Sequence, residues 1–357
     1  MAKETLEKAS PLQASHEASG AKLMPFAGYK LPAWFSSVRD EHMAVRKNLG
    51  IFDISHMCPI RFTGTAVAAF LQRVSCNAIH KADGNRTVYS MLLNEAGGVI
   101  DDVMISQLAE DDYLLICNAA NEDAVMEHLK SQAVTGVQIH SLRDSHGLLA
   151  IQGPNAIQWS AQNVGVSAAE MPRLSVMGAT ILGAPSWVLR SGYTGEDGIE
   201  ILAPKDCIQR LWDTAIAKGV SPCGLAARDS LRIEAGLPLY GQELSTEISP
   251  LMTRYTWVLS KDENYIGREA TETLRDSGVE LKSVGLHVEG RAVPRTGYEI
   301  QEGGYVSSGT FSFCLDHPIA MAFVPKALSE PGTELHIMIR NQAVPAKVVK
   351  LPFLSQS

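Results

Sequence analysis

Residues 94 to 106, NEAGGVIDDVMIS, combine a turn sequence with two adjacent carboxylates. The letters NEAGG predict a hairpin turn, and the apolar run after them predicts a strand. Successive strand residues point to opposite faces, so Asp101 and Asp102 face opposite ways, each among apolar neighbours. Holding a carboxylate against protein costs several kcal/mol unless a partner or a ligand meets it. We therefore expect at least one of the two carboxylates to be buried and to interact with a partner or a ligand.

A second acidic segment, RSGYTGEDGIEI, runs from Arg190 to Ile201. Its three evenly spaced glycines permit sharp turns, and a tyrosine and three carboxylates surround them. One interpretation is an acidic surface hairpin. The other is that one carboxylate, Glu200, faces inward, opposite the two isoleucines that flank it. A carboxylate at a strand end can accept two parallel hydrogen bonds from a guanidine-like edge, and reduced pterins present such an edge.

The segment CGLAARDSLRIEAGLPLYGQEL, from Cys223 to Leu244, carries a cluster of charges. Its pattern predicts a helix from Ala226 to Gly236. Arg228 lies near the start of this helix, after small residues that would let another group approach closely. The alternative is an ordinary helix face on which arginine pairs locally with Asp and Glu, and such surface pairs contribute little.

Several reaction classes lack their usual sequence signals. The chain has no GxxxxGK[ST] phosphate loop, no GxGxxG after a strand, no HExxH and no GxSxG elbow. Its six cysteines include no CxxC pair, which favours reduced core residues over disulfides or a zinc site. The chemistry must therefore lie elsewhere in the chain.

The composition indicates an ordinary globular chain with room for two or three domains: 357 residues, 45% hydrophobic and 20% charged. A net charge of -8 argues against a surface that tracks nucleic-acid phosphates. No run of about 18 apolar residues predicts a membrane span, and the N-terminal letters lack the apolar core of a signal peptide. We expect a cytoplasmic protein that binds neither nucleic acid nor membrane.

The order of predicted elements favours an α+β fold class. From about residue 60 to 142 the patterns read strand, helix, hairpin, strand, helix, strand, which is a ferredoxin-like order. The next hundred residues repeat this order with similar turn chemistry. From about residue 279 short β-prone runs alternate with Gly, Pro and Ser, which is typical of a small β-barrel or sandwich domain.

Over nearly its whole length the chain resembles the aminomethyltransferase family of the glycine cleavage system, the T-proteins. The matching segments include YSMLLNEAGGVIDD, CNAANED, LAIQGPNA, SGYTGEDGIEI, PCGLAARDSLRIEAGLPLYGQEL and PGTELHIMIRNQAVPAKVVKLPF. The resemblance implies two related α+β units around a central folate channel, followed by the β-barrel domain. It also implies tetrahydrofolate as cosubstrate, a lipoylated H-protein as partner, and no metal.

The resemblance assigns roles to individual residues. The catalytic aspartate of the family falls on Asp102, its pterin-binding glutamate on Glu200, and the arginine of its GLxARD motif on Arg228. The remaining positions expected to line the folate pocket are Tyr89, Asn118, Tyr193 and Trp257.

An N-terminal segment and three domains are expected. These are an N-terminal segment (1–55) packing with the central folate-binding domain, a ferredoxin-like α+β domain carrying Asp102 (56–143), a second α+β folate-binding domain (144–278) and a C-terminal β-barrel domain (279–357).

The chain also departs from the family pattern. Tyr29 stands in FAGY where FAGW is common, Ser106 stands where a tyrosine is frequent, and SHMC replaces SHMG. Two alternatives share the folate site: a tetrahydrofolate-dependent demethylase of a small methylated compound, and a non-enzymatic folate-binding assembly protein. The match through AARDSLRIEAGLPLYGQEL favours the aminomethyltransferase. The assembly proteins carry a KGCYxGQE-type cysteine that GLPLYGQEL lacks.

Overall fold

The computed structural model describes residues 8–354, which form two compact units from interleaved parts of the chain. The first unit contains residues 8–71, 79–90 and 103–228, and the second contains 72–78, 91–102 and 229–354. Both mix helices with sheets, which confirms the α+β class. The division into an N-terminal segment and three domains stays a prediction, and residues 1–7 and 355–357 of its first and last ranges lie outside the described residues.

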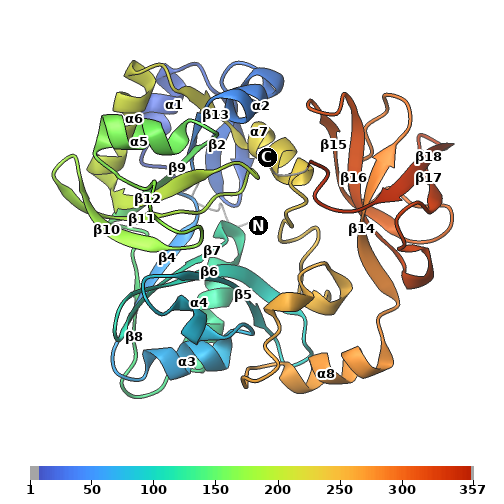
Figure 1. The fold of residues 1–357 in the computed structure, drawn as a ribbon, viewed down its shortest axis with the longest axis horizontal. Coiled ribbons are helices and arrows are strands. Elements are labelled where there is room, and N and C mark those ends of the chain that lie inside the picture. The colour runs from blue at the N-terminus through green and yellow to red at the C-terminus, as the bar shows by residue number, and fades with distance from the viewer. Residues whose placement is uncertain (1–7, 355–357) are drawn as a thin grey trace, which may run out of the picture. The chain divides into compact units, whose positions relative to one another are not determined.

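One five-stranded sheet has the strand order β5-β6-β7-β4-β8. In chain order its elements are β4 (Cys58–Thr63), α3 (Val67–Val74), β5 (Thr87–Leu93), β6 (Val99–Ala109), β7 (Asp112–Cys117), α4 (Glu122–Ser131) and β8 (Gln138–Ser141). The helices α3 and α4 lie against one face of this sheet (Figure 1). This is the expected strand, helix, hairpin, strand, helix, strand order.

A second sheet repeats the first, with the order β10-β11-β12-β9-β3-β13. Its elements are β9 (His146–Gln152), α5 (Ala156–Val164), β10 (Val176–Ile181), β11 (Ala184–Leu189), β12 (Gly198–Pro204), α6 (Lys205–Ala217) and β13 (Ser221–Cys223), together with β3 (Gly50–Asp53) from the N-terminal segment. Corresponding strands take corresponding places in the two sheets, which confirms the repeat. The difference is β3, inserted between β9 and β13.

The N-terminal segment supplies more than β3 to the first unit. Its other elements are α1 (Gln13–Ala18), β1 (Lys22–Phe26), β2 (Tyr29–Trp34) and α2 (Val38–Lys47), and after β13 the chain enters α7 (Leu225–Glu234). The described part of the chain also has the short 3-10 helices η1 (Ile79–Ala82), η2 (Ala119–Asn121), η3 (Pro250–Met252), η4 (Thr256–Val258) and η5 (Lys326–Leu328).

A buried glutamate of α2 fixes the start of α7. The Oε1 atom of Glu41 accepts hydrogen bonds from the backbone N–H groups of Phe35 (2.6 Å) and Ser36 (2.9 Å). Its Oε2 atom accepts one from the N–H of Gly224 at 2.8 Å. Gly224 directly precedes α7, so the carboxylate lies at the N-terminal end of that helix, where negative charge is favourable. The N-terminal segment therefore determines where α7 begins, one turn before Arg228.

The C-terminal strands form a five-stranded antiparallel sheet in the order β15-β16-β14-β18-β17. Its strands are β14 (Leu281–Val288), β15 (Tyr305–Ser312), β16 (His317–Pro325), β17 (Glu334–Ile339) and β18 (Gln342–Val349). Glu299 bridges to β15 and Ile300 to β17, so one short segment joins the two edge strands. The predicted small β domain is therefore present, with single bridges rather than a continuous strand pairing between those edges in the described residues.

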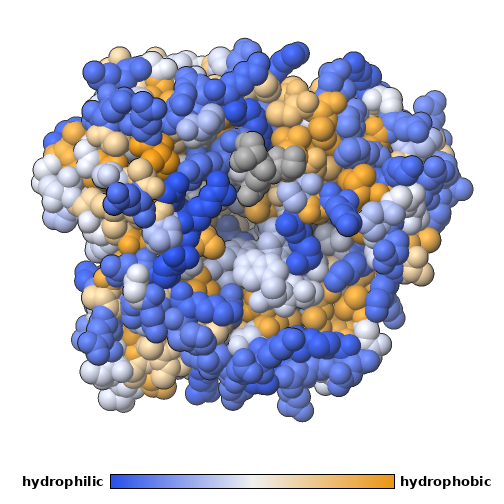
Figure 2. Space-filling model, in the orientation of Figure 1, coloured by the Kyte–Doolittle hydropathy of each residue, from blue (hydrophilic) through white to orange (hydrophobic). Residues whose placement is uncertain are grey.

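The helix α8 (Arg268–Ser277) leads into this sheet in the second unit (Figure 1). Thr271 is its one buried residue, and Figure 2 shows hydrophilic side chains over the helix. None of the helices between residues 8 and 354 has both the length and the apolar character that a membrane span needs.

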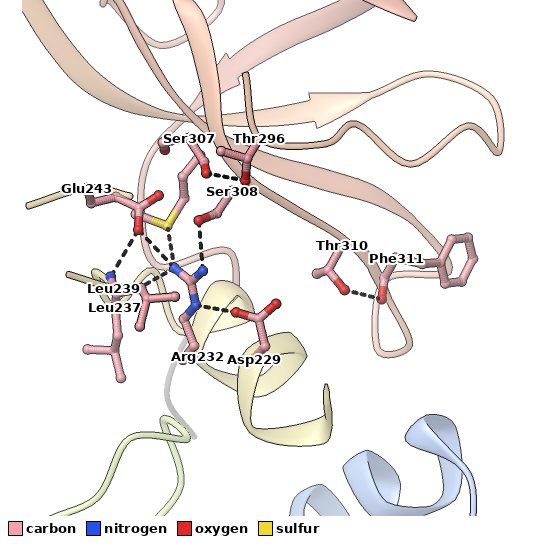
Figure 3. Close-up of polar contacts among 11 residues, drawn as sticks. Asp229, Arg232, Leu237, Leu239, Glu243, Thr296, Ser307, Ser308, Thr310 and Phe311 are labelled. Atoms are coloured by element: carbon pink, nitrogen blue, oxygen red, sulfur yellow. Dashed lines mark hydrogen bonds and ion pairs between the residues drawn. The ribbon is translucent and has the colours of Figure 1, made fainter. Parts of the chain in front are cut away.

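A buried arginine joins α7 to the C-terminal sheet within the second unit (Figure 3). Arg232 is 2% exposed and pairs with Glu243, 1% exposed, at 3.1 Å. Its Nη2 donates to Ser308 Oγ on β15 at 2.7 Å, and its Nε donates to Asp229 at 2.8 Å. Since both members of the Arg232–Glu243 pair are buried, each depends on the other for its charge balance.

Glu243→Gln should lower the unfolding free energy of the full chain by about 3 kcal/mol, because it removes the buried counter-charge of the Arg232 guanidinium and leaves it the half-exposed Asp229. Asp229→Asn is the matched control. The Asp229 side chain is 49% exposed, so its loss should cost less than about 1 kcal/mol. Denaturant unfolding of both variants checks this, and equal losses would contradict it.

Candidate functional site

The turn predicted at residues 94 to 98 is present and is anchored from outside the hairpin. The Asn94 N–H donates to the Gly98 carbonyl at 2.9 Å, and Asn94 Oδ1 accepts from the Gly98 N–H at 2.9 Å. Asn94 Nδ2 donates to the carbonyl of Thr246 at 3.1 Å. A Cβ on Gly98 would lie 1.9 Å from that same carbonyl oxygen, which explains the glycine. The Val99 N–H donates to the Ser245 carbonyl at 2.8 Å, so the start of β6 is fixed.

The two aspartates of β6 differ in burial. Asp101 is fully buried, whereas Asp102 on the opposite face is half-buried. The prediction of a buried carboxylate is therefore met by Asp101, while the residue that the resemblance selects is the more accessible of the two. Ser106, on the Asp102 side of the strand by parity, is fully buried and shares a 2.8 Å hydrogen bond with Thr87. Its hydroxyl thus has a structural partner.

Two tyrosines of the second unit lie in the electrostatic field of Asp102. Burial raises the pKa of Tyr240, and the negative charges of Asp101 and Asp102 add to the increase. Burial also raises the pKa of Tyr255, again with a contribution from Asp102. The Tyr255 hydroxyl donates to the carbonyl of Gly236 at 3.1 Å. Both phenols therefore keep their protons at neutral pH. The LPLYGQEL segment was the only sequence signal for Tyr240, and none pointed to Tyr255.

Two of the three acids in the glycine-rich segment 190 to 201 form ion pairs with arginines of the protein. The Arg190 guanidinium donates to both carboxylate oxygens of Asp197, at 3.3 and 2.7 Å. Burial alone would raise the pKa of Asp197, but the hydrogen bonds and charge of Arg190 outweigh it and lower that pKa. Glu196 pairs with Arg46 at 2.9 Å. Glu200 is half-buried and, between residues 8 and 354, pairs with no arginine or lysine.

A buried glutamine organises this segment from beneath. Gln152 Nε2 donates to the carbonyls of Ser191 (3.0 Å) and Ile199 (3.4 Å), and its Oε1 accepts from Thr194 Oγ1 at 2.9 Å. A Cβ on Gly192 would lie 1.8 Å from Gln152 Oε1. The glycine therefore makes room for the glutamine. Gln152 lies in the LAIQGPNA segment, but its role could not be seen without the fold.

The structure brings Tyr193, Glu200 and Arg228 together in the first unit. The guanidinium carbon of Arg228 lies 4.5 Å from the centroid of the Tyr193 ring. Burial lowers the pKa of Arg228, and Tyr193 and Glu200 oppose that shift. The Glu200 carboxylate accepts a hydrogen bond from Ser191 Oγ at 2.6 Å. A stacked cation, an aromatic ring and a carboxylate with remaining acceptor capacity can together hold a flat, polar ring system.

The other predicted residues lie in different elements. Tyr89 is half-buried on β5, and Asn118 is half-buried directly before η2. Both belong to the first unit. Trp257, in η4 of the second unit, is 55% exposed, and its ring centroid lies 6.3 Å from that of Tyr255. Asp102 is in that second unit as well.

The departure at Tyr29 falls among cationic groups of the first unit. Its ring is buried, with the Arg143 guanidinium 5.6 Å and the Lys8 ammonium 5.9 Å from its centroid. Arg143 Nη2 also contacts the Sγ of Cys58, the residue that replaces glycine in SHMC, at 2.5 Å. Both unusual residues therefore contact the same arginine.

Two family profiles cover most of the chain. The GCVT N-terminal domain matches residues 12–263, and the glycine cleavage T-protein C-terminal barrel domain matches residues 282–354.

Similar proteins agree with these profiles. An aminomethyltransferase of Deinococcus deserti is 39% identical over 355 residues, which cover 98% of each chain. Another, of Thermus thermophilus, is 39% identical over 353 residues, covering 97% of this chain and 99% of its own. The crystal structure of glycine cleavage system aminomethyltransferase T from Bartonella henselae superposes with a TM-score of 0.93 at 34% identity, covering 98% of this chain and 99% of that one.

Gln152→Ala should destabilise the chain by about 1 to 3 kcal/mol, because the partners of its amide stay buried without hydrogen bonds. Gly192→Ala should destabilise it through the clash with Gln152. In the double variant the clash is gone, so the combined loss should be smaller than the sum by at least about 1 kcal/mol. Denaturant unfolding measures this coupling.

Gly178→Ala is the control for that cycle, since a Cβ there has nothing within 4 Å. Its effect should add simply to that of Gln152→Ala. Additive losses in the Gly192 cycle would contradict the role given to Gln152.

Proposed function

We infer, from its membership of the glycine cleavage T-protein family, that this chain is an aminomethyltransferase of the glycine cleavage system. Enzymes of this class use tetrahydrofolate as cosubstrate. We propose that the aminomethyl group arrives on the lipoyl arm of a partner H-protein. The products are then 5,10-methylenetetrahydrofolate, ammonia and the reduced lipoyl carrier.

Glu200, Arg228 and Tyr193 are proposed to hold the pterin of the folate. The observation that carries this proposal is the state of the three acids of segment 190–201. Glu196 and Asp197 pair with arginines, whereas Glu200, within residues 8–354, does not. A half-buried carboxylate with free acceptor capacity suits the guanidine-like edge of a reduced pterin. The Arg228 guanidinium, stacked on Tyr193, supplies a cationic and aromatic neighbour for the same ring system.

Asp102 is proposed to act on the reacting atoms. N5 of the folate attacks a methylene carbon flanked by sulfur and nitrogen, and positive charge develops in an iminium-like arrangement. A carboxylate held beside that charge stabilises it and orients the folate amines, and such a group contributes roughly 10² to 10³ in rate. Proton transfer is a second role open to it. The more accessible position of Asp102, compared with Asp101, supports contact with a ligand.

The half-buried residues Tyr89 and Asn118 and the exposed Trp257 complete the proposed folate-binding set. Their assignment rests on the family motifs, as does the central folate channel, which stays a prediction.

Asp102→Asn should lower the turnover of aminomethyl-loaded H-protein with tetrahydrofolate by roughly 10²-fold or more, because the developing positive charge loses its counter-charge. The assay measures methylenetetrahydrofolate formation and is run beside small methylated sulfur, oxygen and nitrogen donors. Near-normal turnover would remove Asp102 from the chemistry. Activity of the wild type with small donors alone would replace this function with the demethylase alternative.

Glu200→Gln should weaken tetrahydrofolate binding about tenfold or more, because it removes a charge-assisted pair of hydrogen bonds, while the unfolding temperature stays near that of the wild type. Glu196→Gln, in the same loop, is the matched control and should leave the folate dissociation constant within about twofold. Titration by fluorescence or calorimetry distinguishes them. An unchanged constant in Glu200→Gln would contradict the pterin assignment.

A further inference from the structure

His56 is a buried polar residue with no part in the chemistry above. It lies in the loop between β3 and β4 and is 3% exposed. Its Nδ1 atom is buried and, within residues 8–354, has no hydrogen-bond partner. Buried polar atoms are nearly always satisfied in native proteins, so an exception calls for an explanation.

The packing around His56 explains why a ring is buried there but not why the ring carries a polar Nδ1 atom. The imidazole meets the rings of Phe26 and Tyr29 edge to face, with centroid distances of 5.6 and 6.4 Å. The His56 backbone carbonyl accepts a hydrogen bond from Arg143 Nη2 at 3.4 Å. An apolar side chain of similar size could make the ring contacts equally well, and the carbonyl would be the same with any residue.

The charges near His56 come from two other elements. Arg143, after β8, and Arg228, on α7, both act electrostatically on the imidazole. Arg228 is the arginine that stacks on Tyr193 beside Glu200, so His56 lies within the field of the proposed pterin site. Tyr29 is the remaining titratable side chain that the ring meets.

The imidazole is neutral under working conditions. Burial, with the positive charges of Arg228 and Arg143, lowers the pKa of His56 to about 3. A neutral ring offers one donor and one acceptor and adds no charge next to two guanidinium groups. The two guanidinium groups also disfavour a cationic ligand atom next to His56, so the cationic aminomethyl group is not a suitable partner. An uncharged N–H or carbonyl group of the ligand is a suitable partner.

We propose that His56 is a further folate-contacting residue, whose Nδ1 forms a hydrogen bond with an uncharged N–H or carbonyl group of the reduced folate. This inference rests on the proposed folate site of Glu200, Arg228 and Tyr193 and adds a contact from the loop between β3 and β4. The ligand supplies the partner that the protein does not, which accounts for the polar nitrogen in an otherwise aromatic setting.

Two amide substitutions, His56→Asn and His56→Gln, serve as a matched pair in the test. His56→Asn places an amide nitrogen or oxygen close to the position of Nδ1, His56→Gln places it close to Nε2, and His56→Leu has neither. Tetrahydrofolate binding to the full chain should weaken less than about threefold in His56→Asn and about tenfold or more in His56→Gln and His56→Leu. Turnover at saturating folate should change much less than the dissociation constant.

Unfolding curves serve as the control for folding and for the neutral state. The folded-state pKa lies below the unfolded value of about 6.5, so the unfolded chain binds the extra proton. Stability of the wild type should therefore fall as pH drops from about 6.5 towards 3, and part of that fall should be absent from both amide variants.

Equal weakening in the Asn and Gln variants would indicate a packing role and overturn the inference. So would unchanged binding in His56→Leu while the wild type binds folate. Failure of the wild type to bind tetrahydrofolate would instead overturn the proposed function itself, and with it this contact.

Discussion

The three backbone N–H groups held by the buried Glu41 carboxylate are the constraint on which the candidate site depends. Two of them belong to Phe35 and Ser36, and the third to Gly224 at the start of α7. Arg228 follows one helical turn later and stacks on Tyr193. A single acid in the N-terminal segment thus positions a cation nearly 190 residues further along the chain. Because charge-assisted hydrogen bonds are short and directional, this arrangement leaves the helix start little freedom.

The glycine-rich segment 190–201 is also fixed by hydrogen bonds from one buried side chain. Gln152 satisfies carbonyls and a hydroxyl of the loop, and Gly192 gives it the space. Arg190 then closes the loop on Asp197. Each polar atom used in this way is unavailable to a ligand. The site is therefore defined by what internal pairing leaves over, namely the carboxylate of Glu200 and the guanidinium of Arg228.

Protonation states follow from the same burial. Tyr240 and Tyr255 stay protonated near Asp102, and His56 stays neutral near Arg228 and Arg143. Desolvation is the main cause in each case, since it penalises the charged form of an acid and of a base alike. Tyr240, Tyr255 and His56 therefore add no charge of their own at neutral pH.

The sequence by itself determined the α+β class, the repeated element order, the turn before β6 and the family to which the motifs belong. Those features depend on local periodicity, turn residues and motif order, which are visible along the chain. The tertiary structure decided that Asp101, not Asp102, is the fully buried carboxylate, and that Ser106 is bound to Thr87. It also decided which acid of the glycine-rich segment 190–201 remains available, because Arg46, the partner of Glu196, lies 150 positions away. Ion pairs between residues so far apart in the sequence are set by tertiary packing, which local sequence patterns do not predict.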